Sequence, residues 1–212
     1  MSREAGLAGS QREVAAEWTA AVEAAGFPLA AGDAGRGRSR IAFGAPLPVG
    51  MAAERELIDV VLTEAWPVWK VREALEPHVP AGWSLIDVHD VWLGGPPLAG
   101  RVAAADYRIE LQGGPEAVTL QRAAADLVAA DRIPRQRMKG GANVDYDLRP
   151  LLVTVAVEPG PPITVRTRTR FDPELGTGRP EEVLGALADR LGSPLESRSI
   201  VRERLLLDED LR

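Results

Sequence analysis

The sequence has no cysteine. This absence excludes a disulfide framework, a thiolate metal site, a cysteine-ligated iron–sulfur cluster and a cysteine nucleophile. Histidine is scarce as well, since His78 and His89 are the only two among 212 residues. A site built from several imidazole ligands is therefore excluded too. We expect the chain to bind no metal and to carry no cofactor of its own.

Long hydrophobic runs are also missing. No stretch approaches the roughly 20 consecutive apolar residues that span a bilayer, and the segment Met1–Ser10 lacks the apolar core of a signal peptide. We therefore expect a cytoplasmic location and no membrane contact. The composition, 45% hydrophobic and 26% charged, is that of an ordinary globular protein.

Recognisable catalytic motifs are a third absence. The sequence has neither the G-x-S-x-G elbow of a serine hydrolase nor a Walker loop, and Gly32–Gly37 lacks the preceding strand and the lysine that a phosphate loop needs. Asp87, His89 and Asp90 make a poor metal site, because the carboxylates would point to opposite faces of a strand. A non-catalytic protein is favoured, and an enzyme of unknown reaction with its site between two halves of the chain is kept as the alternative.

Hydrophobic periodicity divides the chain into helices and strands. Ser10 and Glu13 have the spacing of a capping box at the start of the first helix. The predicted helices are 11–26, 67–77, 115–130 and 180–191. The predicted strands are 41–43, 56–63, 83–91, 105–111, 133–138, 151–157, 163–170 and 197–207, and a hairpin turn is expected at residues 140–141.

A cluster of glycine and proline at Leu93–Gly100 predicts a boundary near the midpoint. We expect two similar halves, residues 1–96 and 97–212, each with the order strand, helix, strand, strand, helix, strand. The first strand of the first half is degenerate or missing. The predicted fold class is α+β, with two tandem ferredoxin-like halves whose antiparallel sheets carry helices packed on one face.

Several blocks of the sequence are similar to those of a known family. Arg40–Gly50 reads RIAFGAPLPVG and is followed closely by Glu56–Val60, while Asp147–Pro150 and Arg179–Leu184 come later. In order and spacing these blocks resemble the radical SAM-linked, or radical SAM-associated, proteins, an uncharacterised bacterial family. The positions that carry the family motif here are Arg40, Phe43, Gly44, Pro48, Gly50, Asp147 and Arg149.

The resemblance implies a partner. Members of the family are fused to, or encoded beside, a radical SAM enzyme that supplies the iron–sulfur cluster, and this chain has no cysteine to hold one. The chain would therefore be the companion of that enzyme. It departs from the family at Gln11, where a histidine is usual, and at Ala34–Gly37, where a Gly-Phe-(Asn or His)-Pro pattern is usual. These departures indicate a divergent member.

Basic residues recur at every second position in two runs of the second half. In an extended strand such residues share one face and form a row about 13 Å long, which suits phosphate or RNA. The other interpretation is a solvated face whose arginines pair with acids, and the net charge of −6 disfavours general nucleic-acid binding. We predict that the two rows converge on one exposed anion- or RNA-binding patch. The candidate binding residues are Arg135, Arg137, Lys139, Arg166, Arg168 and Arg170.

Two tryptophans offer a second candidate surface. Trp66 and Trp69 flank a proline and fit either a partner-docking patch or core packing. Together these features predict a non-catalytic accessory or substrate-binding module that acts with a radical SAM enzyme, on RNA or a ribosome-related substrate. A stand-alone RNA-binding protein is the remaining alternative.

Overall fold

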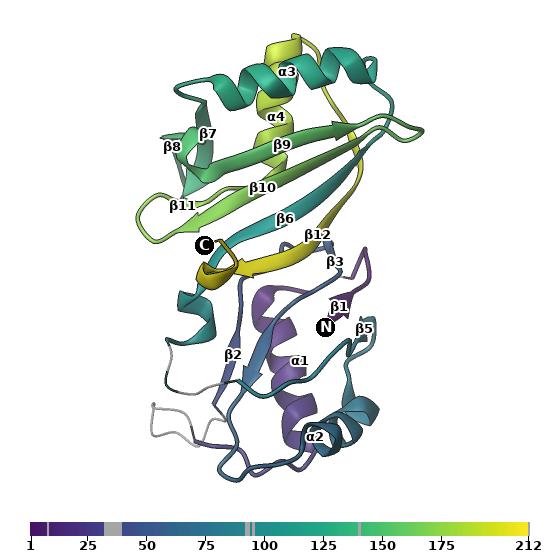
Figure 1. The fold of residues 1–212 in the computed structure, drawn as a ribbon, viewed down its shortest axis with the longest axis vertical. Helices are drawn as coiled ribbons and strands as arrows, with labels where there is room; N and C mark the ends of the chain where they lie inside the picture. Colours follow the sequence, from purple (N-terminus) through teal and green to yellow (C-terminus); the bar gives the residue numbers. More distant parts are fainter. Residues whose placement is uncertain (8, 32–39, 92–93, 95, 140, 212) are drawn as a thin grey trace. The chain divides into compact units, whose positions relative to one another are not determined.

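The structure, a computed structural model, describes residues 1–7, 9–31, 40–91, 94, 96–139 and 141–211. The chain divides into two compact units, Met1–Val102 and Ala103–Arg212 (Figure 1). Each unit has a hydrophobic core of its own. The glycine-rich segment Gly32–Gly37 and part of the expected boundary segment Leu93–Gly100 lie outside the described residues.

Four long strands form the sheet of the second unit. β10 lies between β9 and β6 and is antiparallel to both, and β12 lies on the other side of β6. A short strand, β11 (Gly176–Thr177), pairs with the end of β10. The four long strands are β6 (Val102–Leu111), β9 (Leu152–Glu158), β10 (Thr164–Asp172) and β12 (Ser197–Leu207).

One face of this sheet is covered by two helices, α3 (Ala117–Ala129) and α4 (Pro180–Leu191) (Figure 1). Leu120 and Leu127 lie seven residues apart on α3, which places them on the same side of the helix. Both are buried in one core cluster with Val165 of β10. The apolar face of α3 therefore packs against the inward-facing side chains of β10 in the core.

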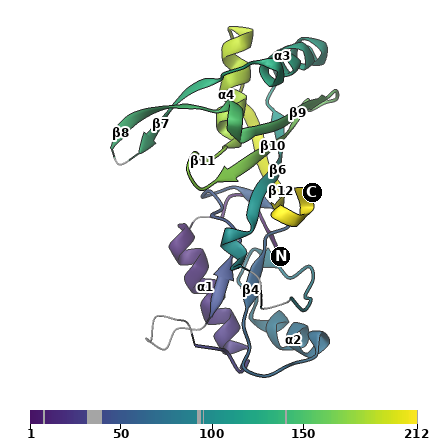
Figure 2. The same ribbon diagram turned by 60° about the vertical axis from the view of Figure 1, so that its left-hand side comes forward.

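A hairpin is inserted between α3 and β9. Its strands, β7 (Pro134–Lys139) and β8 (Ala142–Asp147), pair with each other in an antiparallel ladder. Gly141 in the turn has a φ of +83°, a conformation that favours glycine. Figure 2 shows the hairpin projecting from the second unit.

The first unit has shorter elements. β1 pairs with both β3 and β5, and β2 pairs with β4, all antiparallel. Its described helices and strands are β1 (Ser2–Arg3), α1 (Gln11–Ala24), β2 (Ile41–Phe43), β3 (Ala52–Ala53), β4 (Ile58–Val60), α2 (Val68–Leu75) and β5 (Trp83–Ser84). Single-turn 3₁₀ helices occur at Glu76–His78, Leu98–Gly100, Arg149–Leu151 and Asp208–Leu211.

Aromatic packing builds the core of the first unit. Trp18 of α1 is fully buried and meets Trp83 edge to face, with ring centroids 5.6 Å apart. At the start of α1 both bonds of the predicted capping box are present: the Ser10 hydroxyl accepts from the Glu13 N–H, and the Glu13 carboxylate accepts from the Ser10 N–H. The helix therefore begins where the sequence places it.

The α+β class is confirmed. The second unit runs β6, α3, β9, β10, α4, β12, which is the ferredoxin-like order with a hairpin added. In the first unit the described strands form separate short ladders, and the tandem arrangement stays a prediction. The strand that could not be located from the sequence is β1. The strand expected at 83–91 is wrong beyond Ser84, because residues 85–91 pair with no described strand.

Candidate functional site

The arginine row of β10 lies on the sheet face opposite the helices. Val165 is buried in the core beneath α3 and α4, and side chains alternate between the two faces of a strand. Arg166, Arg168 and Arg170 therefore share the other face, as the sequence predicts.

Carboxylates from three other strands meet this row. Arg168 donates from Nε and Nη2 to the two oxygens of Asp106 at 2.7 and 3.0 Å. Arg166 donates from Nε to Glu158 at 2.6 Å and from Nη1 to Glu203. Two further arginines join: Arg108 contacts Glu110 and Glu203, and Arg204 contacts Asp106. We call these eight residues the sheet-face network: Asp106, Arg108, Glu110, Glu158, Arg166, Arg168, Glu203 and Arg204.

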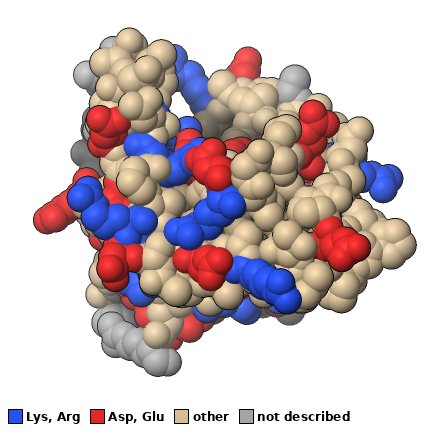
Figure 3. All heavy atoms as spheres, turned by 90° about the horizontal axis from the view of Figure 1, so that it is seen from above, with Lys and Arg blue, Asp and Glu red and all other residues tan. Residues whose placement is uncertain are grey.

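The sheet-face network carries as many carboxylates as guanidinium groups. Burial alone would raise the pKa of Asp106, but hydrogen bonds from Arg168 and Arg204 outweigh that effect and lower the pKa. The same bonds raise the pKa of Arg168. This part of the sheet face is therefore close to electrically neutral. On the face shown in Figure 3, too, basic and acidic side chains are interspersed.

Arg135 of β7 points to a different place. Its Nε donates to Glu182 of α4 at 3.0 Å, and its Nη1 pairs with Asp189, about two turns further along the same face of the helix. Arg135 thus lies on the helix-covered side of the second unit, whereas Arg166 lies on the open side. The expected single convergent patch is wrong, because the two rows occupy different sides and Arg135, Arg166 and Arg168 are paired with acids.

Arg137 is the arginine of the hairpin without an acidic partner among the described residues. Its guanidinium carbon lies 4.8 Å from the ring centre of Tyr146, and Nη2 donates to the carbonyl of Leu175 at 3.2 Å. Its charge is held in place, and no carboxylate of the described residues neutralises it. Lys139 ends β7, and its side chain lies outside the described part of the chain. Arg170 is exposed at the end of its row.

The family-motif residues Asp147 and Arg149 fix backbone at the base of the hairpin. Asp147 Oδ1 accepts from the N–H groups of Ile133 and Arg149. Burial raises the pKa of Asp147, yet these backbone bonds and Arg132 lower it by more. The Arg149 guanidinium donates to the carbonyls of Ala130 and Leu152. The two residues therefore hold the backbone at the base of the hairpin.

The family-motif segment Arg40–Gly50 forms β2 and the loop after it. Arg40 is exposed, and its backbone bonds to Ala30 and Val61. The N–H of Gly44 donates to Leu57, and the carbonyl of Pro48 accepts from Met51. Gly50 has a φ of +78° and accepts from Gly6. Phe43 belongs to the partly buried shell of the core.

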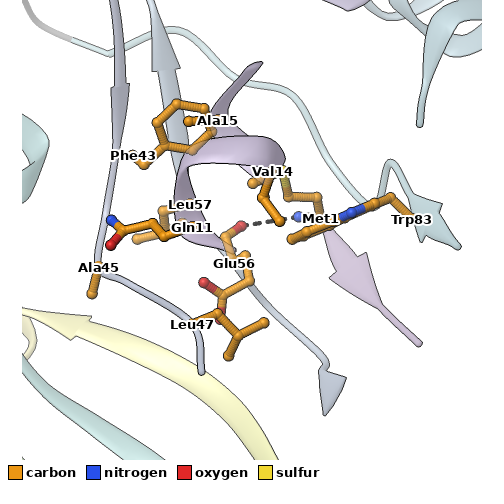
Figure 4. A pocket seen from close by; sticks show the side chains of 10 residues that line it. All are labelled: Met1, Gln11, Val14, Ala15, Phe43, Ala45, Leu47, Glu56, Leu57 and Trp83. Carbon is orange, nitrogen blue, oxygen red and sulfur yellow. Dashed lines mark hydrogen bonds between the residues drawn. The ribbon is translucent and has the colours of Figure 1, made fainter. Parts of the chain in front are cut away.

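A small cavity adjoins this motif. It measures about 40 Å³ and is lined by Met1, Gln11, Val14, Ala15, Phe43, Ala45, Leu47, Glu56, Leu57 and Trp83 (Figure 4). Ligand pockets are usually several hundred Å³. The cavity has room for water but not for a substrate, so the motif is associated with core packing and not with a substrate pocket.

The two tryptophans of the docking hypothesis have different environments. Trp66 packs edge to face against Phe27 at 5.7 Å and lies under Lys70 at 3.8 Å. Trp69, in contrast, is 66% exposed. Trp66 therefore packs against the core of the first unit, whereas Trp69 lies on the surface.

A metal site is not found in the described part of the chain. No three His, Asp or Glu side chains gather there as they would around a metal ion. His89 lies 3.7 Å from Asp87, and both are largely exposed. Across the described residues, no helix has the length and apolar character needed to cross a membrane.

The acids of the sheet-face network are the residues that sequence reasoning missed. Asp106, Arg108 and Glu110 occupy every second position of β6, so the charges on that face alternate in sign. A search for charged rows of either sign on the other predicted strands would have found this row, since opposite charges stabilise cross-strand pairs.

Comparisons with known proteins give a family and a fold. The family model of DUF2344, described as an uncharacterised protein conserved in bacteria, matches residues 10–181. A chain of a Cbf5–Nop10–Gar1 complex aligns with a TM-score of 0.53 and 9% identity, over 96% of this chain and 47% of that chain. This chain thus spans about half the length of that chain, and the likeness at this identity concerns the fold alone. No curated protein matches the chain.

Proposed function

The chain belongs to the DUF2344 family of uncharacterised bacterial proteins, and we propose that it is a non-catalytic accessory module. In this proposal it docks on a radical SAM enzyme and holds that enzyme's substrate, for which RNA is the candidate. The radical SAM partner comes from the sequence resemblance. The observation that supports docking is the exposure of Trp69.

Trp69 belongs to a small apolar surface on the first unit. On α2, Leu75 is buried in the core and Trp69 faces outward. Val68 precedes it and is 37% exposed, while Arg72, one turn further on, donates from Nη1 to the carbonyl of Ile86 at 3.0 Å. Ile86 is itself exposed. We call Val68, Trp69 and Ile86 the Trp69 surface.

The chemistry of the Trp69 surface suits a protein partner. Tryptophan is enriched among the few interface residues that carry most of the binding energy. A large aromatic side chain left in water gives up the apolar burial that a partner would supply. Because Arg72 holds the Ile86 segment against α2, the surface needs little rearrangement before it binds.

The test is a binding measurement with the radical SAM enzyme encoded nearest to this chain. We expect the two purified proteins to elute together in gel filtration, with the absorbance of the iron–sulfur cluster in the shared peak. Trp69→Ala should weaken the complex by about 30-fold or more, the size of an interface hot spot.

A matched variant controls for general loss of apolar surface. Val118→Ala alters an exposed apolar residue on α3 and should leave the complex unchanged. Normal binding by Trp69→Ala would remove the Trp69 surface from the proposal. Failure of the wild-type chain to bind the enzyme would refute the accessory role.

A further inference from the structure

We propose that the arginine side of the β7–β8 hairpin, together with the start of α4, binds the phosphate backbone of a single-stranded nucleic acid. This inference deepens the proposed function and rests on it, because it names the class of substrate that the accessory module holds. The contacts would be made by Arg137 and Arg179, with Tyr146 as support.

The register of the hairpin separates its charges. Residues directly opposite each other on paired strands share a face, and neighbours along a strand alternate. Arg135 is opposite Tyr146, and Arg137 is opposite Val144. The face that they share contains two arginines and a tyrosine, and no acid.

The other face of the hairpin carries the acids. Gln136 is opposite Asp145 and bonds to it at 2.7 Å, and Pro134 is opposite Asp147. The carboxylates of Asp145 and Asp147 therefore lie away from Arg137. The acids of α4 that meet the arginine side, Glu182 and Asp189, are paired with Arg135 and not with Arg137.

Arg135 anchors the hairpin and is not itself a ligand in this proposal. It is paired with Glu182 and Asp189 of α4. This double ion pair joins the base of β7 to the helix, so the position of Arg137, two residues further on, is set relative to α4. An anchored site loses less conformational entropy when it binds.

The Arg137 guanidinium is partly buried, with Tyr146 beside it and with Nη2 donating to the carbonyl of Leu175. Its Nε is buried without a bonding partner among the described residues, so Nη1 is the nitrogen that remains for an external anion. Gly176 leaves space for the Arg137 guanidinium, since a Cβ on residue 176 would lie 2.9 Å from Arg137 Nη1. A guanidinium can bind phosphate with two parallel hydrogen bonds or stack on a base.

Arg179 adds a second cation at the start of α4. It is the residue at the start of α4, it is exposed, and its side chain has no ion pair in the described part of the chain. Burial and Glu182 raise the pKa of the Tyr146 hydroxyl, while Arg137, Arg135 and Arg179 act against that rise. The raised pKa keeps the Tyr146 hydroxyl protonated at neutral pH, so it remains a hydrogen-bond donor.

The wider surface limits the binding mode. The net charge is −6, and the sheet-face network neutralises much of the other arginine row. Contact should therefore be confined to about two phosphates. For single strands this predicts a slope of log K against log salt of about −1.4, from roughly −0.7 per phosphate.

The experiment measures fluorescence anisotropy of a labelled oligouridylate and a labelled oligothymidylate with the full chain over a salt series. We expect binding at low salt with the shallow slope given above. Arg137→Ala and Arg179→Ala should each weaken binding several-fold and reduce the slope by about 0.7. Comparing the two oligonucleotides shows whether RNA or DNA is preferred. Tighter binding of the oligouridylate indicates RNA, and equal binding indicates that phosphate and base are recognised without the 2′-hydroxyl.

Arg122→Ala is the matched control, because Arg122 is an exposed arginine on α3 with no ion pair among the described residues. It should bind like the wild type. Arg179→Ala also guards against misfolding, since it alters an exposed side chain. The inference is overturned if the wild type binds neither strand at the lowest salt, if both arginine variants bind normally, or if polyglutamate displaces the oligonucleotide as well as unlabelled RNA does, which would point to an acidic protein.

These outcomes are separable from those of the proposed function. Arg137→Ala should still elute with the radical SAM enzyme, and Trp69→Ala should still bind the oligonucleotide. Loss of enzyme binding with nucleic-acid binding intact would refute the docking proposal alone.

Discussion

The guanidinium of Arg135 lies directly over Gly185 of α4. A Cβ at position 185 would overlap with Arg135 Nη2. Glu182 and Asp189, which flank Gly185 by three and four residues, bond to the same guanidinium. Glu182, Gly185 and Asp189 therefore form one binding surface for the Arg135 guanidinium on a single face of α4. The guanidinium fits against this surface because Gly185 has no side chain.

We expect Gly185→Ala to loosen the hairpin. Alanine in a helix interior is normally more stable than glycine by about 1 kcal/mol, but here the new methyl group must displace Arg135 from Glu182. The usual gain in stability from alanine should therefore disappear, and the amides of β7 and β8 should exchange faster with deuterium. In an Arg135→Ala background the clash is absent, and Gly185→Ala should then stabilise the protein. If Gly185→Ala changes the thermal stability equally in both backgrounds, the close contact between Arg135 and Gly185 does not matter for stability.

The carboxylate of Glu203 should control the charge of the sheet face. Arg108 and Arg166 both bond to it, so Glu203→Gln removes one negative charge from the sheet-face network. We expect the variant to elute from a heparin column at higher salt than the wild type, because a polyanion would then meet uncompensated guanidinium groups.

Glu181→Gln provides the comparison for Glu203→Gln. It makes the same change in net charge at an exposed position of α4 where no ion pair is found in the described structure. An equal shift for both variants would mean that heparin responds to net charge alone and that the network does not matter.

Elements with strong local signals could be predicted from the sequence. Pro180–Leu191 and Ser197–Leu207 are a helix and a strand with the predicted bounds. The proline at the first helical position is a local start signal, and Gly192 after the last position, with a φ of +64°, is a local stop signal. The residues after Ser84 alternate equally well but form no strand, because a strand also needs a partner that local alternation does not reveal.

The candidate site could be predicted only in part, for a related reason. The period of β10 correctly puts Arg166 and Arg168 on one face. Their partners Glu203 and Asp106, however, come from strands 37 and 62 residues away in the sequence. A charge pattern within one strand does not show which charges the neighbouring strands bring, and those charges decide whether a row of arginines is free.

Acid should destabilise the protein through Asp147 and Asp106. The pKa of each carboxyl is lowered in the folded protein, so the unfolded chain binds protons more readily. The stability that these groups contribute is present above the unfolded pKa of about 4 and is lost as the pH falls through the lower folded pKa. Urea unfolding from neutral pH down to about pH 3 should show this loss, and Asp147→Asn should flatten the curve in that window.

Asp131→Asn is the control for the acid experiment. Asp131 is exposed, and its carboxylate has no bonding partner in the described part of the chain. Its replacement should leave the pH dependence as in the wild type. A curve for Asp147→Asn as steep as that of the wild type would show that its backbone bonds do not contribute to acid sensitivity.

Thr169 should be more important for stability than its small size implies. It is fully buried on the helix side of β10, and its hydroxyl donates to the carbonyl of Gly178 at 2.7 Å. Thr169→Val keeps the shape but leaves that carbonyl without this donor, which costs about 1–3 kcal/mol when the group is buried. Gly178 cannot simply turn away, because it is packed so closely that a Cβ on it would lie 2.7 Å from Thr169 Cβ and 2.9 Å from the carbonyl of Leu151. Thr164→Val makes the same substitution on the same strand at a partly exposed position and should change the free energy of unfolding by less than about 0.5 kcal/mol. Urea denaturation of both variants measures the difference, and equal stabilities would show that the Thr169 bond contributes nothing beyond packing.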